Sequence, residues 1–135
     1  MHARACVCVH ARAEYGTALA TWAGRRLSEL WGTEVMAMSE DHPSWIVMVR
    51  VPDFDSSEQS SYVRGRLASD FRTNASWTQW GGQTWQRLSA QIYLDRETIE
   101  EYGQRVLDLQ AEHRLLNDNE ALQEVDANTV DQSRL

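Results

Sequence analysis

The run from Trp45 to Val51 constrains the fold more than any other segment of this chain of 135 residues. It reads Trp-Ile-Val-Met-Val-Arg-Val, which is rich in β-branched side chains and too short for a typical helix, and Pro52 follows it. We therefore predict a well-buried strand here. A chain of this length is close to the commonest size of a single domain, so the strand should belong to one compact core.

Three other segments show the spacing of amphipathic helices. From Ala13 to Trp31, apolar residues recur every three or four positions. Ser56 or Ser57 is placed to cap a second helix, which should reach about residue 72. Asp95 is placed to cap a third helix, with its apolar side formed by Ile99, Tyr102, Val106, Leu109 and Leu116.

A hairpin is predicted between the second and third helices. The segments from Ser76 to Trp80 and from Trp85 to Leu94 flank Gly81-Gly82, and adjacent glycines supply the positive φ values of a tight turn. A short extended piece is also expected around residues 35–38. This order of elements favours an α+β fold, a small antiparallel sheet with helices packed on one face.

The ends of the chain differ from its middle in composition. We expect residues 1–12 to be a poorly ordered N-terminus and residues 13–116 to form the single α+β domain. Residues 117–135 hold five acidic residues and one arginine, with few apolar side chains, so we predict an acidic tail that is a weak helix or disordered.

Charge limits the classes of function. The chain has 13 basic and 20 acidic residues, a formal net charge of −7, and all 13 basic residues are arginine. Without a lysine amine there is no Schiff base on this chain and no phosphate-binding lysine. An acidic protein also disfavours nucleic acid and anionic membranes as partners. The first twelve residues do not resemble a secretory signal, and no apolar run is long enough to span a membrane. We therefore expect a cytoplasmic protein.

Candidate catalytic and metal-binding groups are few. Cys6, Cys8, His2 and His10 lie close together but lack the usual spacing of zinc ligands, so we predict no metal site, with a weakly ordered terminus as the simpler interpretation. His113 is spaced with the apolar residues of its helix and is interpreted as a packed or rim histidine rather than a base. The acidic residues of that helix are interpreted as a solvated face.

Six tryptophans are many for this length. Trp22 and Trp45 fit the predicted helix and strand, so we expect them in the core. Trp77, Trp80 and Trp85 surround the hairpin, where some must stay partly exposed and form a contact surface.

Arg87 is the one candidate binding residue. It lies in the second hairpin strand among Trp85, Leu88, Ile92 and Tyr93, and its planar guanidinium could bind a small carboxylate through two parallel hydrogen bonds. The alternative is a structural ion pair or a merely solvated strand residue.

The segment from Trp85 to Tyr93, Trp-Gln-Arg-Leu-Ser-Ala-Gln-Ile-Tyr, resembles the Arg-Ile/Leu-Ser segment near the carboxyl end of class V aminotransferases, the cysteine-desulfurase-like group of enzymes that use pyridoxal phosphate (PLP). The stretch from Ala23 to Glu34 is similar to the helix that opens the small domain of that family, and the stretch from Val47 to Pro52 to the strand after it. The residues of these segments are most similar to those of the isopenicillin-N-epimerase-like branch of the family, and the resemblance covers about residues 14–109.

This resemblance implies a fold, a cofactor and a role for one residue. In the family, the arginine of that segment binds the α-carboxylate of an amino-acid substrate, which implies that role for Arg87; Ser89 would help to shape the strand. It implies PLP as cofactor, yet this chain lacks the large domain and the lysine that forms the internal aldimine. We expect a small domain that is not catalytic alone and that associates either with a large-domain polypeptide or with a second copy of itself. The alternative is a stand-alone α+β interaction or small-ligand-binding module that forms a homodimer through the hairpin tryptophans.

Overall fold

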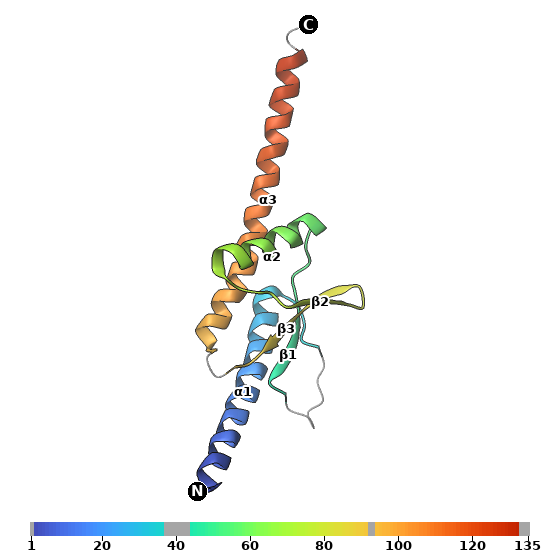
Figure 1. Ribbon diagram of the computed structural model, residues 1–135. Helices are drawn as coiled ribbons and strands as arrows, with labels where there is room; N and C mark the ends of the chain where they lie inside the picture. Colours follow the sequence, from blue (N-terminus) through green and yellow to red (C-terminus); the bar gives the residue numbers. More distant parts are fainter. Residues whose placement is uncertain (1, 37–43, 92–93, 133–135) are drawn as a thin grey trace.

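The computed structural model describes residues 2–36, 44–91 and 94–132, with the backbone alone for residues 2–13 and 132. The chain forms three helices and three strands (Figure 1). In chain order they are α1 (His2–Trp31), β1 (Ile46–Arg50), α2 (Ser57–Phe71), β2 (Trp77–Trp80), β3 (Gln83–Ser89) and α3 (Arg96–Gln132). The predicted α+β class is therefore confirmed.

The three strands form one antiparallel sheet in the order β1-β3-β2. Gly81 and Gly82, at φ values of 60° and 75°, make the predicted turn between β2 and β3. β3 ends at Ser89 rather than near Leu94. The next residue, Ala90, donates its N–H to the carbonyl of Trp45 (2.7 Å), the residue before β1, and this is the last bond of the pairing between the two strands. Residues 92 and 93 of the predicted strand lie outside the described residues.

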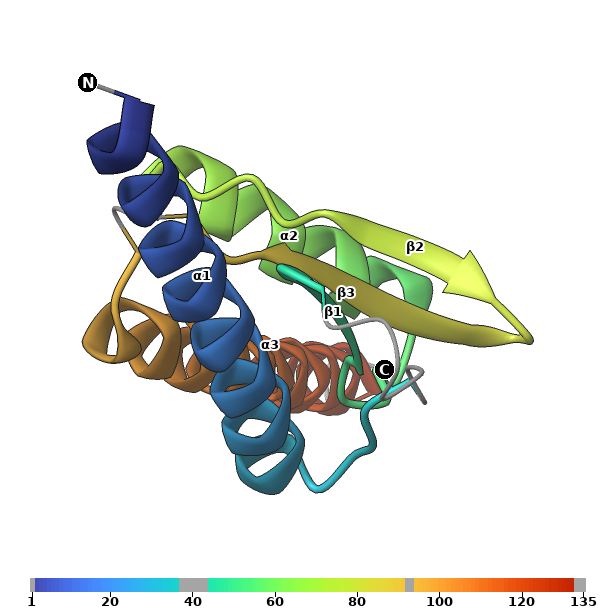
Figure 2. The same ribbon diagram turned by 90° about the horizontal axis from the view of Figure 1, so that it is seen from below.

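All three helices contact the same face of the sheet (Figure 2). α1 packs so closely on β1 that a Cβ on Gly24 would lie 2.7 Å from a methyl group of Val47. On the same face, the hydroxyl of Tyr102 in α3 donates to Gln86 of β3 and accepts from the indole N–H of Trp77 in β2 (3.2 Å). The buried apolar core lies between this face and the helices, and all of its fully buried members fall between Leu19 and Leu109.

The ends of α1 and α3 lie beyond the predicted bounds. α1 begins at His2 rather than at Ala13, so the helix includes residues 2–12. α3 continues from the predicted capping residue Asp95, which accepts from the Thr98 N–H (2.8 Å), as far as Gln132. No glycine or proline interrupts residues 2–15 or 104–132, so nothing in either segment terminates a helix that packing has already nucleated.

Two predicted core residues are exposed. Trp45 precedes β1 and lies over Gly16 of α1, but 44% of its surface remains exposed. Leu116 is 45% exposed, and it lies two residues beyond Arg114, which bonds to Asp55 just before the start of α2. By contrast, Trp22 packs against the core, and His113 is buried against the ring of Tyr62, as predicted for a packed histidine.

Candidate functional site

In the described part of the chain, Arg87 lies on the side of the sheet that faces away from the packed helices. Alternation along β3 places Arg87 on the side opposite Gln86 and Leu88, which face the helices. We call this second side the open face. It consists of Ile46, Met48 and Arg50 from β1, Thr78 and Trp80 from β2, and Gln83, Trp85, Arg87 and Ser89 from β3.

The backbone holds Arg87 firmly while its side chain stays exposed. Arg87 pairs with Met48 of β1, and its N–H donates to the carbonyl of Ser76 (2.9 Å) on the other side. Within the described part of the chain, the guanidinium takes part in no recorded ion pair, side-chain hydrogen bond or ring contact. The structural ion pair that we considered as an alternative is thus not found among the described residues.

Most of the other described arginines have a charged or aromatic partner within the domain. Five of the described arginines form ion pairs, and two more lie over tryptophan rings: Arg26, Arg50, Arg66, Arg105 and Arg114 in the first group, Arg64 and Arg96 in the second. Of the described arginines that remain, Arg25 lies in α1 and Arg72 ends α2, whereas Arg87 lies in the sheet. A free guanidinium in mid-strand is therefore placed to receive an anion from outside this domain.

A tryptophan and a second arginine flank Arg87 on the open face. Trp85 is only 5% exposed, donates its indole N–H to the carbonyl of Trp80 (3.2 Å), and meets the Trp80 ring edge to face. Arg50 pairs with Trp85 across the strands and is held by Asp53 (3.0 Å) and Glu34 (3.6 Å), while its Nε makes no hydrogen bond. Apolar surface beside a guanidinium strengthens its interaction with an anion once a partner excludes water.

Sequence reasoning missed Arg50, Met48 and Ile46 as neighbours of Arg87. The alternation of β1 places these three residues on one face of that strand, which the sequence alone could have indicated. Which residue of β1 lies opposite Arg87 depends on the register between two strands that are far apart in the chain, and that register is a tertiary property.

The charged groups on the helix side serve packing. Arg114 donates two hydrogen bonds to Asp55 (2.6 and 3.0 Å), and these bonds hold the pKa of the Asp55 carboxyl below its usual value. Glu112 accepts from the hydroxyl of Tyr62 (2.6 Å), which lowers the pKa of Glu112. Both contacts join α3 to α2 or to the segment before it, so these groups tie the helices together.

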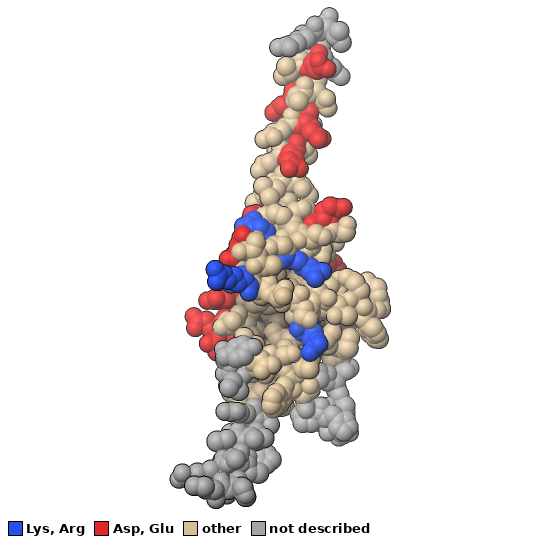
Figure 3. Space-filling view, in the orientation of Figure 1, with Lys and Arg blue, Asp and Glu red and all other residues tan. Residues whose placement is uncertain are grey.

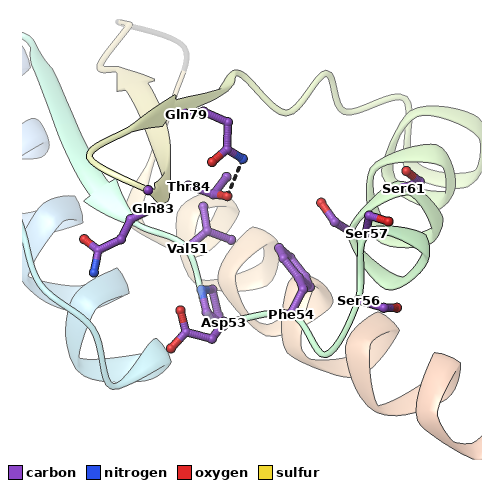
Figure 4. Close-up of a pocket in the computed structure, with 12 residues that line it drawn as sticks. Val51, Asp53, Phe54, Ser56, Ser57, Ser61, Gln79, Gln83 and Thr84 are labelled. Atoms are coloured by element: carbon purple, nitrogen blue, oxygen red, sulfur yellow. Dashed lines mark hydrogen bonds between the residues drawn. The ribbon is translucent and has the colours of Figure 1, made fainter.

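A hollow of about 400 Å³ lies between the start of α2 and the hairpin (Figure 4). Hydroxyl and amide side chains line most of it, and Gln79 donates to Thr84 (2.6 Å) across one wall. Ser56, at its floor, is already used as the cap of α2. Asp53 is the only ionisable side chain among the described residues that line the hollow, and its carboxylate accepts a hydrogen bond from Arg50 (3.0 Å).

The side chains of Cys6, Cys8, His2 and His10 lie outside the described residues. Elsewhere in the described part, no three His, Cys, Asp or Glu side chains gather in a way that could hold a metal ion. None of the helices within the described residues combines the length and the hydropathy that a membrane crossing requires.

Comparison with known proteins identifies no family. No protein-family model matches this chain, and none of the curated proteins matches it either. The function must therefore be argued from the open face and from the sequence resemblance.

Proposed function

We propose that this chain is the small domain of a PLP-dependent enzyme of the class V aminotransferase type, and that Arg87 binds the α-carboxylate of an amino-acid substrate. The observation that carries the proposal is the position of Arg87: its guanidinium has no partner among the described residues and lies in the middle of a strand, on the open face.

The open face has the composition of a surface that another domain covers. Trp80 is 66% exposed and Ile46 is 36% exposed, although both are large apolar residues. Exposed apolar side chains beside a charged group are typical of a contact surface rather than of a solvated one. A large domain packed there would enclose Arg87, and the lower local dielectric would strengthen its hydrogen bonds to a carboxylate.

Arg87 would orient the substrate rather than react with it. Its fork can donate two parallel hydrogen bonds to one carboxylate, which fixes both the position and the rotation of an amino acid. Trp85 lies two residues before Arg87 on the same face, and its ring is buried with its N–H bonded to the carbonyl of Trp80. The rigid strand thus pre-organises the binding group.

The chain does not fit PLP by itself. The cofactor is carried on a lysine amine in its enzymes, and this sequence contains no lysine. We therefore assign cofactor attachment to a separate large domain and derive no catalytic step for this chain alone.

A nuclear magnetic resonance titration tests the role of Arg87. The probe is L-alanine, and L-alaninamide, which lacks the carboxylate, is the matched control ligand. We expect saturable shifts of the Arg87 Nε–H signal and of neighbouring β3 amides with L-alanine only. Because a charge-assisted hydrogen bond contributes about 1.5–3 kcal/mol, Arg87→Gln should weaken binding by roughly tenfold or more.

Arg72→Gln is the matched control variant, since Arg72 is also exposed and makes no recorded ion pair among the described residues, but ends a helix. It should leave the titration unchanged. If L-alanine produced no saturable shift, or the same shift in Arg87→Gln as in the unmodified chain, the carboxylate site would be refuted.

A second candidate function is a stand-alone interaction module that dimerises through the hairpin. Trp80, at the hairpin end, is the observation that favours it, because 66% of this large aromatic residue is exposed. In this case Trp80→Ser should convert a dimer into a monomer in size-exclusion chromatography with light scattering, while Thr78→Ser should not. A monomer in both variants and in the unmodified chain would exclude this alternative.

A further inference from the structure

The hollow between the start of α2 and the hairpin is lined from two sides by side chains that both donate and accept hydrogen bonds (Figure 4). The helix contributes serine hydroxyls beyond its capping residue, and the hairpin contributes two amides and a threonine hydroxyl: Ser57, Ser60 and Ser61 on one side, Gln79, Gln83 and Thr84 on the other. The volume of about 400 Å³ lies within the range of about 300–1,000 Å³ that is usual for small-molecule sites. The hollow therefore has the size to hold a small organic molecule.

These polar groups keep hydrogen-bonding capacity that the protein itself does not use. Among the described residues, the side chains of Ser60, Ser61 and Gln83 take part in no recorded hydrogen bond. Gln79 donates through Nε2 to Oγ1 of Thr84 (2.6 Å), so the side-chain oxygen of Gln79 and the hydroxyl proton of Thr84 remain available. Hydroxyls and amides both donate and accept, so they match a ligand whose own groups do the same.

The charges around the hollow favour an uncharged ligand. No residue from 76 to 86 is charged, and Figure 3 shows the hairpin as an uncharged surface. Asp53, the one ionisable side chain among the described lining residues, is paired with Arg50 (3.0 Å). Glu58, in the first turn of α2, already supplies the negative charge that a helix start favours. An anion would lack a basic partner in the lining, and a metal ion would lack a second carboxylate.

Phe54 gives the hollow an aromatic surface in a fixed position. Its ring lies against Trp77 of β2, with 5.2 Å between the ring centroids, and the guanidinium of Arg64 lies over the same indole at 5.8 Å. Figure 4 shows Phe54 between Thr84 of the hairpin and Ser57 of α2. An aromatic surface between two rows of hydrogen-bonding groups fits a ring that has an apolar C–H face and a rim of hydroxyls, which is the form of a sugar.

We propose that this hollow binds an uncharged sugar, with the C–H face of the ring against Phe54 and the hydroxyls bonded to Ser61 of α2 and Gln79 of the hairpin. The site is separate from that of Arg87, because Thr84 and its cross-strand partner Gln79 lie on the opposite side of the sheet. It therefore does not depend on the function proposed for Arg87. Since each neutral hydrogen bond contributes little in water, the dissociation constant should be on the order of 1 mM.

A nuclear magnetic resonance titration of the full chain with sugars tests the proposal. The probes are D-glucose, D-galactose, D-mannose and N-acetyl-D-glucosamine, and cyclohexylmethanol, a six-membered ring with a single hydroxyl, is the control ligand. We expect saturable shifts of the side-chain amide signals of Gln79 and Gln83 with at least one sugar and none with cyclohexylmethanol. Arg87→Gln should bind the sugar as the unmodified chain does, so the sugar site and the carboxylate site can fail separately.

Matched double variants locate the binding in the hollow. Ser61→Ala with Gln79→Met removes one hydrogen-bonding group from each side with little change in size, and it should raise the dissociation constant by about tenfold or more. Ser69→Ala with Gln104→Met makes the same two chemical changes at exposed positions outside the hollow and should leave the dissociation constant unchanged. Urea unfolding followed by circular dichroism verifies that both variants are folded.

Three results would overturn the proposal. The first is the absence of a saturable shift with all four sugars up to the high-millimolar range. The second is an equal loss of affinity in the two double variants, since the sugar would then bind outside the hollow. The third is tighter binding of D-glucuronate than of D-glucose, because a preference for the carboxylate would show that the hollow is a site for anions.

Discussion

Gly103 sits where α1 and α3 approach most closely, and a single added methyl group there should destabilise the fold. A Cβ on Gly103 would lie 2.7 Å from Cδ2 of Leu27 and 2.8 Å from Cδ2 of Leu30. Leu27 is fully buried and cannot swing into solvent. The Gly103 carbonyl also accepts a hydrogen bond from the indole N–H of Trp31 (3.0 Å), so moving α3 away would strain a second contact.

Two opposing effects decide the sign for Gly103→Ala. Alanine is favoured over glycine in a helix interior by about 1 kcal/mol. Overpacking a filled core costs typically about 1–3 kcal/mol. We expect the second effect to win, with a net loss of about 1 kcal/mol in the free energy of unfolding.

Gly65→Ala is the matched control, because Gly65 lies within α2 and nothing lies within 4 Å of the Cβ that would be added. This variant should show only the helix-propensity effect and gain up to about 1 kcal/mol. Urea unfolding followed by circular dichroism measures both variants, and the difference between them isolates the cost of the clash. If Gly103→Ala were stabilised as much as Gly65→Ala, the close approach of α1 and α3 would be wrong.

Three further predictions concern caps and ionisable groups. Ser56→Ala removes the Oγ that accepts from the Gln59 N–H (3.1 Å) and should cost about 1 kcal/mol in urea unfolding, whereas Ser61→Ala, at an exposed position of the same helix, should change stability by less than about 0.5 kcal/mol. The hydrogen bond from the Thr98 N–H lowers the pKa of Asp95. The stability that ionised Asp95 contributes is therefore present above the ordinary pKa of a free aspartate and is lost as pH falls through its pKa in the folded protein. Asp95→Asn should remove this part of the acid dependence of unfolding, and an unchanged acid transition would contradict the prediction. Burial raises the pKa of Tyr102, so the stability that the protonated hydroxyl contributes is present below the ordinary tyrosine pKa and is lost at higher pH. The absorbance of tyrosinate should show one tyrosine that ionises at higher pH than the others, and this step should disappear in Tyr102→Phe. An identical titration of both proteins would count against the prediction.

The local signals of the sequence located the elements well. Ser56 caps α2, Asp95 caps α3, and Gly81-Gly82 turns the hairpin, because each of these features depends on hydrogen bonds or dihedral angles within a few residues. The helix ends were predicted less well. α1 begins at His2 instead of Ala13, and α3 runs to Gln132 through the segment that we predict as a weak helix or disordered, since no glycine or proline interrupts residues 2–15 or 104–132.

Part of the candidate site was also accessible from the sequence. Its resemblance to class V aminotransferases singled out Arg87, and the alternation of strands placed Trp85 on the same face. Arg50 and Met48 were not found as neighbours, because they come from a strand whose register against β3 is set by the whole core. The role of Arg87 as a carboxylate-binding residue stays a proposal.

The sequence by itself determined which segments are helical or extended and where the turns and caps lie, since these depend on short-range geometry. Only the tertiary structure decided which side of each strand is covered. It turned Gln86 and Leu88 of β3 toward the helices and Arg87 away from them, and it left the guanidinium of Arg87 without a partner among the described residues. The reason is physical: a strand presents two faces, and which one becomes the core depends on how helices distant in the chain pack against it.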